Sequence, residues 1–223
     1  MLGSLKSYWA FTKTGYRFVM FGLIPIAVLV TALGFVAVDS EMIVLALVIS
    51  FLVLWMVEPM SDRLFLGGFY GKNKGALEFL QSSNKFSKFM QDVVIVDIFR
   101  RMATYLITYL IICMIGYVNG VEKEMEINMF VACSFLPFYS MLISQIEVLV
   151  GRHFDMWNHQ YIVVMVGFIL QGIGLTSLIK LFLTTGMEVV WTITALFFVV
   201  FVVVAIGTVV YTNKVVKRSY YDK

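Results

Sequence analysis

The chain contains six apolar runs, each about as long as a membrane is thick. An α-helix needs roughly 20 apolar residues to cross the hydrocarbon core of a bilayer. Runs near this length, without the alternation of a barrel strand, occupy residues 18–38, 42–60, 102–119, 128–150, 161–184 and 187–211. Backbone amides that face lipid must be satisfied within their own segment. The sequence therefore predicts an all-α, polytopic membrane protein with six transmembrane helices in a single domain, residues 1–223.

Polar sequence is too scarce for a separate soluble domain. Hydrophobic residues make up 61% of the 223 residues, whereas typical soluble proteins are about 45–50% apolar. Cys113 and Cys133 both lie in apolar runs, which favours small core-facing or lipid-facing side chains over a disulfide. Several Trp and Tyr residues, Tyr16 and Trp55 among them, fall near the ends of the runs and suit the headgroup layer.

Basic residues collect on one side of the predicted topology. Of the 17 Lys and Arg residues, only Lys123 and Lys180 fall outside the N-terminus, the 61–101 loop, the loop after the fourth run and the C-terminal tail. The loops on the opposite side are mainly acidic. Positive charge is retained on the cytoplasmic side of a membrane, so we expect both termini and the 61–101 loop to be cytoplasmic.

The 61–101 loop is the longest polar passage between the apolar runs. Its apolar residues are costly to leave in water, so we expect it to fold against something. The pattern predicts a short helix over 76–81, a break at 82–84 and a second helix, with Ser87 as a candidate N-cap, that runs through Asp97 into the third span. Apolar residues at steps of three and four give this second helix a stripe, formed by Phe86, Phe89, Met90, Val93 and Val94.

Two interpretations of this amphipathic helix are open. It could lie on anionic lipid, with Lys85, Lys88, Arg100 and Arg101 near the headgroups. Alternatively, it could be a docking element for a cytoplasmic protein.

Residues 75–101, GALEFLQSSNKFSKFMQDVVIVDIFRR, resemble the loop after the second span of ABC-2 type transporter permeases. In that loop a Glu and a hydrophobic pair precede a small polar break, a basic residue and an apolar helix. The matching positions are Glu78, Phe79, Leu80, Ser82, Ser83, Lys85 and the run 93–98. Six spans, cytoplasmic termini and an amphipathic helix over 8–17 also match, whereas Ser83-Asn84 stands where many members carry Leu-Pro.

The resemblance implies a permease subunit of an ATP-driven transporter for a peptide, lipid or amphiphilic compound. It implies docking of a separate cytoplasmic ATP-binding subunit on the loop, and a second permease copy or a homologous permease beside this one. The candidate coupling residues are Glu78, Phe79, Leu80, Lys85 and Phe86. The alternative is a non-transporting membrane adaptor or regulatory protein whose loop binds lipid or a protein partner.

Enzymatic chemistry is not expected in this chain. Gly71-Lys72 is followed by Asn73 and lacks the upstream Gly of a Walker A loop, so ATP hydrolysis is assigned to the separate subunit. His153 and His159 are poorly spaced for zinc, and no catalytic motif is present. We therefore expect no catalytic, cofactor or metal site, and no nucleic-acid partner.

Three ionisable residues fall within the predicted spans. Glu58, Glu147 and Lys180 are close enough to an interface to snorkel, and the alternative is that they line a path or join helices. Gln171 lies deeper in its span. Because Gly167, Gly172 and Gly174 are nearby, Gln171 is a better candidate for close helix packing than for ligand contact. Glu58, Glu147 and Gln171 are the path-lining or interhelical candidates.

Overall fold

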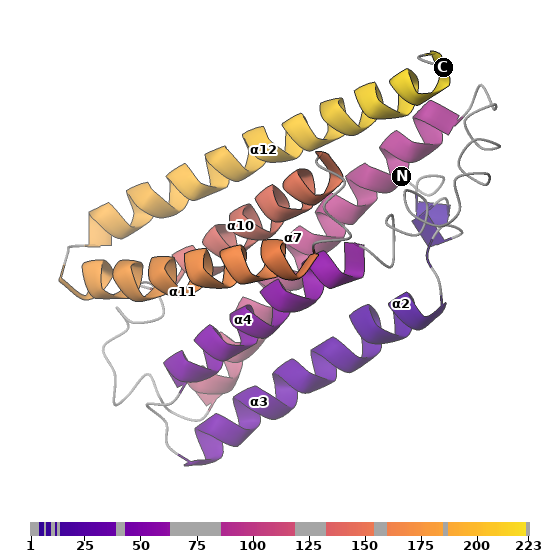
Figure 1. The fold of residues 1–223 in the computed structure, drawn as a ribbon. Helices are drawn as coiled ribbons and strands as arrows, with labels where there is room; N and C mark the ends of the chain where they lie inside the picture. Colours follow the sequence, from indigo (N-terminus) through magenta and orange to yellow (C-terminus); the bar gives the residue numbers. More distant parts are fainter. Residues whose placement is uncertain are drawn as a thin grey trace.

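The computed structural model describes residues 5–6, 8–9, 12, 14–38, 43–62, 86–118, 133–153, 160–184 and 187–221. This part of the chain is all-α, with six helices. They are α2 (Thr14–Phe18), which continues through the π-helix η1 (Val19–Leu23) into α3 (Ile24–Val38), then α4 (Ile43–Asp62), α7 (Phe86–Val118), α10 (Phe135–His153), α11 (Gln160–Thr184) and α12 (Met187–Tyr221). Figure 1 shows them running back and forth along one axis, with both chain termini at the same end, here called the termini end.

Three helical segments are long and apolar enough to cross a membrane: Thr14–Phe35, Lys88–Val118 and Glu188–Tyr211. Three shorter apolar helices, Ile43–Glu58, Phe135–Val150 and Met165–Thr176, lie with them. The predicted all-α fold with six helices is thus confirmed. Because a helix rises 1.5 Å per residue, α7 and α12, with 33 and 35 residues, are each about 50 Å long.

The surface of the bundle is apolar and much of its interior is polar. Large hydrophobic side chains of α3, α11 and α12 are exposed, for example Val30, Ile173 and Val203, each at least 63%. The buried polar residues include Glu58, Asp97, Arg100, Arg101, Gln145, Glu147 and Gln171. A soluble protein has the opposite distribution. This arrangement fits a bundle whose outer surface meets lipid.

The helices α4, α7 and α10 form the centre of the bundle. In the structure α10 packs against α4, α7, α11 and α12, and α7 packs against α3, α4 and α12 as well. Phe51 of α4 stacks on Tyr105 of α7 with ring centroids 5.9 Å apart. Both side chains are fully buried. The central helices therefore supply most of the large core side chains.

The second half of the predicted 61–101 loop is the first half of α7. This helix runs without interruption from Phe86, as the prediction of one helix continuing into the third span required. Ser87 lies inside it rather than at its N-cap. The side chains of Met90, Val93 and Val94 are buried, and Met90 and Val93 belong to the core cluster of the bundle. This part of the predicted stripe is therefore covered by other parts of the chain.

The fourth helix begins later than predicted. Cys133 and Ser134 form a turn, with the Leu136 amide donating to the Cys133 carbonyl at 3.0 Å, and α10 starts at Phe135. Residues 128–132 lie outside the described part. Pro137 has no amide proton and crowds the carbonyl four residues before it, so it is tolerated in a first turn but not in a helix interior. The last helix, in contrast, extends ten residues beyond the predicted end at 211, to Tyr221.

Proline also marks an irregularity in the first helix. Pro25 cannot donate a hydrogen bond to Phe21, and its ring crowds that carbonyl. Immediately before it, the Ile24 amide donates to Val19, a five-residue step that closes the π-helix η1. The chain therefore keeps its helical direction through Pro25 by widening one turn.

Candidate functional site

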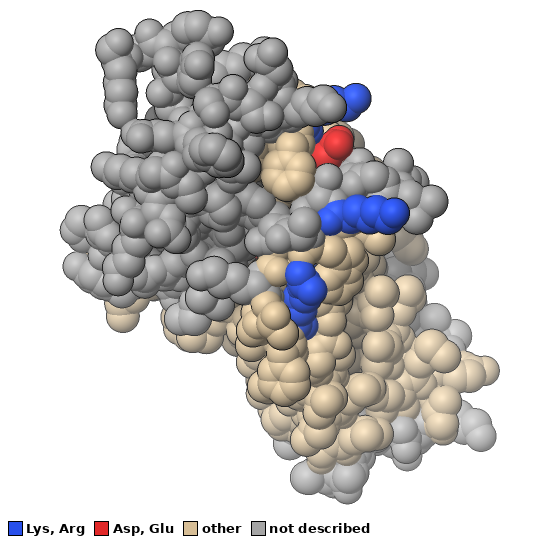
Figure 2. All heavy atoms as spheres, turned by 90° about the vertical axis from the view of Figure 1, so that its right-hand side faces the viewer, with Lys and Arg blue, Asp and Glu red and all other residues tan. Residues whose placement is uncertain are grey.

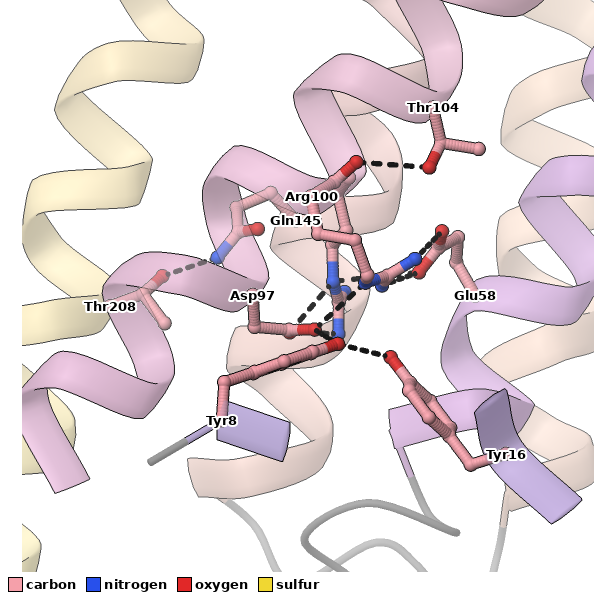
Figure 3. A network of polar contacts seen from close by, with 9 residues as sticks. Tyr8, Tyr16, Glu58, Asp97, Arg100, Thr104, Gln145 and Thr208 are labelled. Carbon is pink, nitrogen blue, oxygen red and sulfur yellow. Dashed lines mark hydrogen bonds and ion pairs between the residues drawn. The ribbon is translucent and has the colours of Figure 1, made fainter. Parts of the chain in front are cut away.

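Four charged side chains meet inside the bundle near the termini end. Arg100 of α7 donates two hydrogen bonds to Glu58 of α4, Nη1 to Oε1 at 2.8 Å and Nη2 to Oε2 at 2.6 Å. Its Nε also lies 3.2 Å from Oδ1 of Asp97. Arg101 donates from Nε and Nη2 to Oδ2 of Asp97, at 3.0 and 2.9 Å, and its Nε lies 3.5 Å from Glu58. Glu58, Asp97, Arg100 and Arg101 are here called the ion-pair cluster, and Figure 3 labels Glu58, Asp97 and Arg100 within it.

The ion-pair cluster is balanced in charge and almost completely buried. Glu58 has no exposed surface, and the side chains of Asp97, Arg100 and Arg101 are 2 to 6% exposed. A lone charge in such a place costs several kcal/mol, whereas two carboxylates and two guanidinium groups compensate one another. The parallel Arg100–Glu58 bonds have the planar two-point geometry that arginine makes with a carboxylate. The cluster thus fixes the orientation of α4 relative to α7.

Two tyrosines from the N-terminal region complete this centre. The hydroxyl groups of Tyr8 and Tyr16 lie 2.8 Å apart, and Tyr8 donates to Oδ1 of Asp97 at 3.4 Å. The guanidinium of Arg100 lies 5.8 Å from the centroid of the Tyr16 ring. Burial, together with the negative charge of Asp97, raises the pKa of the Tyr8 hydroxyl above its ordinary value. Tyr8 therefore keeps its proton and remains a hydrogen-bond donor to Asp97.

Arg17 holds the N-terminal residues against α2. Its Nε donates to Oγ1 of Thr12 at 3.0 Å and its Nη2 donates to the Thr12 carbonyl at 2.8 Å. The guanidinium also lies over the Trp9 ring, 5.0 Å from the centroid. These contacts keep Tyr8 within reach of Asp97. Basic side chains are visible on this end of the bundle in Figure 2.

Burial near the termini end corrects three expectations from the sequence. Arg100 and Arg101 do not lie near lipid headgroups, because the structure pairs them with acids in the interior. Tyr16 and Trp55 are 2% and 0% exposed and do not form part of a headgroup belt. Glu58 does not snorkel. Lys180, in contrast, is exposed on α11.

A second buried carboxyl, Glu147 of α10, has a different environment. It is 7% exposed, and neither carboxyl oxygen has a hydrogen-bond partner among the described residues. It lies over Gly167 of α11: a Cβ on that glycine would overlap Oε1 of Glu147 and come within 2.5 Å of Cζ2 of Trp55. The Trp55 indole is close to the carboxyl, but its N–H does not meet the geometry of a hydrogen bond. The absence of a side chain at Gly167 therefore leaves the space that Glu147 and Trp55 occupy.

Polar contacts continue along the seam between α10 and α11. The Gln171 amide donates to Oγ of Ser140 at 2.7 Å, and the Tyr139 hydroxyl donates to the Leu170 carbonyl at 2.8 Å. A Cβ on Gly174 would overlap that hydroxyl, whereas Gly172 has nothing within 4 Å. Gly167 and Gly174 thus provide the close packing predicted from sequence, and Gly172 does not. Gln171 lies in this seam as an interhelical contact.

On the other side of α10, a side-chain hydrogen bond reaches α12. Nε2 of Gln145 donates to Oγ1 of Thr208 at 3.0 Å (Figure 3). Both residues are buried. Polar side chains of α10 therefore contact α11 on one face and α12 on another.

The remaining candidate residues lie at the limits of the described part of the chain or outside it. Glu78, Phe79, Leu80 and Lys85 are outside the described residues, and Phe86 is the first residue of α7. Cys113 and Cys133 are free thiols, as predicted. Among the described residues, no group of three or more His, Cys, Asp or Glu side chains could hold a metal ion.

The ion-pair cluster was not predicted, although the sequence contains a signal for it. The buried stripe of α7, continued in steps of three and four from Met90, Val93 and Val94, arrives at Asp97 and then at Arg101. Acids and bases on the buried face of an apolar helix need partners, and Glu58 is the partner that a second helix supplies. Comparisons with protein-family models, curated proteins and solved structures found no match to this chain.

Proposed function

We propose that this chain is a multi-pass membrane protein with six transmembrane helices and cytoplasmic termini, and that it is the permease subunit of an ATP-driven transporter of the ABC-2 type. In this proposal a cytoplasmic ATP-binding subunit contacts the segment before α7, and a second permease copy or a homologous permease completes the substrate path. The support is the resemblance of residues 75–101, the asymmetry of the basic residues and the architecture of α7.

The observation that carries the proposal is the connection of α7 to the termini end. This helix starts directly after the segment that contains Glu78 and Phe79, and it continues as one helix for 33 residues. About a third of the way along α7, the ion-pair cluster connects this helix to α4 and to Tyr8. A displacement at Phe86 would therefore be transmitted to the interior by a rigid element, because a continuous helix and a buried bidentate ion pair both resist bending.

A groove beside α7 has the size and lining expected of a binding site for an amphiphilic substrate. It has a volume of about 490 Å³ and lies between α7 and the first helix, with apolar walls that include Ile24, Val28 and Ile107. Tyr8, Arg100 and Thr104 also line it. The volume is in the range of small-molecule sites, roughly 300–1,000 Å³. An alkyl chain would fit the walls, and a polar headgroup would fit beside these three residues.

Orientation in the membrane can be tested with two exposed residues at opposite ends of the bundle. Lys88 lies in the first turn of α7 and Glu188 in the first turn of α12. We expect a membrane-impermeant thiol reagent to label Glu188→Cys in intact cells and Lys88→Cys only after permeabilisation. The wild-type protein, with its two native cysteines, gives the background. The reverse pattern would overturn the cytoplasmic assignment of the loop and with it the proposed coupling.

The partner can be tested by purifying the full-length protein from its native membranes in mild detergent. We expect a subunit with a Walker A sequence to co-purify and to hydrolyse ATP. Glu78→Ala with Phe79→Ala should release that subunit, whereas Lys88→Ala, an exposed substitution a short distance along the chain, should retain it. If the protein purifies without an ATP-binding subunit at its native abundance, the transporter assignment is wrong and an adaptor becomes the better interpretation.

A further inference from the structure

We propose that Glu147 is a proton-binding site inside the bundle. The first observation is its isolation. The side chain is more than nine-tenths buried, and both carboxyl oxygens lack a hydrogen-bond partner among the described residues. A carboxylate in that position would carry an uncompensated charge away from water, which costs far more than burial of a neutral carboxylic acid. A bound proton removes that cost.

The second observation is the character of the surrounding helices. Among described residues, α11 places Gly167 against the carboxyl and α4 places the apolar ring of Trp55 there. On α7, Tyr105 is within electrostatic range of Glu147, and it also interacts with Glu58 and Arg101. On α12 the neighbour of this part of α10 is Thr208, which is uncharged. Arg101 itself is engaged with Asp97 and Glu58, so the ion-pair cluster already uses its charge.

The third observation is a set of buried polar atoms near Glu147 that have no partner among the described residues. They are the Tyr105 hydroxyl in α7, which is within electrostatic range of Glu147, and Oγ of Ser144, which precedes Glu147 by three residues in α10. Orphaned buried polar atoms in a native protein commonly mark ordered water or a site that exchanges a ligand. Tyr105 and Ser144 are thus polar groups that could exchange a proton with Glu147 through ordered water.

The proton on Glu147 can be observed by infrared spectroscopy of the full-length protein in lipid nanodiscs at neutral pH. A protonated carboxylic acid has a carbonyl stretching band that a carboxylate lacks and that shifts in deuterated water. We expect this band in the wild type and its loss in Glu147→Gln, which has the size and neutrality of the protonated side chain and should fold. Thr208→Val, a substitution on α12, should keep the band. Identical band intensity in the wild type and Glu147→Gln would overturn the proposal.

Chemical labelling provides a second, independent readout. A hydrophobic carbodiimide reacts with protonated carboxyl groups in apolar surroundings and adds its own mass to them. We expect mass spectrometry of digested membranes to find the adduct on Glu147 and at least tenfold less on Glu58, which is also buried but is ion-paired. Equal or greater labelling of Glu58 would count against the proposal. Neither measurement depends on ATP or on a transport substrate, so both remain informative if the proposed function is wrong.

Discussion

Glu58 and Glu147 are buried carboxyl groups at the same end of one bundle, yet they are held in opposite ways. Glu58 accepts two hydrogen bonds from Arg100 and lies 3.5 Å from Arg101. Glu147 lies against a glycine and an indole, with no hydrogen-bond partner among the described residues. Both residues are more than nine-tenths buried, so their different partners decide the charge that each group can carry. The first site is suited to fixing helices together, and the second is suited to gaining and losing a proton.

The contrast has a consequence for any conformational cycle of the bundle. Opening the ion-pair cluster would expose charges whose partners lie on α4, α7 and the N-terminal region, which makes this centre costly to rearrange. The seam between α10 and α11 depends on two glycine contacts and two neutral hydrogen bonds. We therefore expect α11 to be the more movable element relative to the α4–α7 pair.

The largest effect is expected from neutralising Glu58. Glu58→Gln leaves Arg100 buried beside a neutral amide, and breaking a buried ion pair by removing one partner costs about 3–5 kcal/mol. Glu147→Gln removes no ion pair and should change the free energy of unfolding by less than about 1 kcal/mol, within the range of a substitution that makes no cavity and leaves no charge unpaired. Thermal unfolding of both variants in the same detergent compares them directly. Equal destabilisation would show that Glu147 is ionised and paired.

The sequence predicts the helices better than it predicts the side-chain contacts between them. Runs of apolar residues set the six helices because length and hydropathy are local properties of the chain. The pairing of Glu58 with Arg100, 42 residues later, depends on how two helices face each other, and no local pattern determines that. The positive-inside rule assigned Arg100 and Arg101 to the cytoplasmic loop. That rule does not predict whether a basic residue forms an ion pair.

The roles of the aromatic residues were also beyond a local pattern. Tyr16 and Trp191 both lie near the ends of apolar runs, but Tyr16 is 2% exposed and Trp191 55%. The difference arises because Tyr8 folds back over the start of the first helix and brings its hydroxyl to Tyr16. Sequence did single out Glu58, Glu147 and Gln171 as charged or polar residues in apolar runs. It could not separate the paired carboxyl from the isolated one.

An intermediate effect is expected from filling the space at Gly167. In Gly167→Ala the new Cβ would overlap Oε1 of Glu147 and approach Trp55 within 2.5 Å. Overpacking of this kind typically costs about 1–3 kcal/mol. Gly172→Ala, one helix face away with nothing within 4 Å, is the matched control and should leave the unfolding temperature unchanged or slightly higher.

A double-mutant cycle tests whether Glu147 is the group that Gly167 accommodates. In a Glu147→Ala background the Gly167→Ala substitution should cost less, because one of its two clashes has been removed. Additive losses would show that the Trp55 contact alone sets the cost. The proposed proton site would then lie further from α11 than the structure indicates.

A smaller effect is expected at the margin of the ion-pair cluster. Tyr8→Phe removes the hydroxyl that donates to Asp97 and contacts Tyr16. At 3.4 Å the bond to Asp97 is long, so we expect a loss of about 0.5–1.5 kcal/mol. Tyr117→Phe, at a position of α7 that is 66% exposed, is the control and should be neutral within error. No loss in Tyr8→Phe would mean that the N-terminal residues are not coupled to α7 in solution.

The smallest effect is expected from loss of the neutral hydrogen bond between Gln145 of α10 and Thr208 of α12. Thr208→Val keeps the shape of the side chain and removes the acceptor for Nε2 of Gln145. Interhelical hydrogen bonds in membrane proteins average only about 0.6 kcal/mol, because the separated helices find other partners. Gln145 is buried with its Oε1 already without a partner in the described chain, so the substitution adds a second orphaned group. A loss well above 1 kcal/mol in thermal unfolding would indicate that this bond belongs to a larger polar network between α10 and α12.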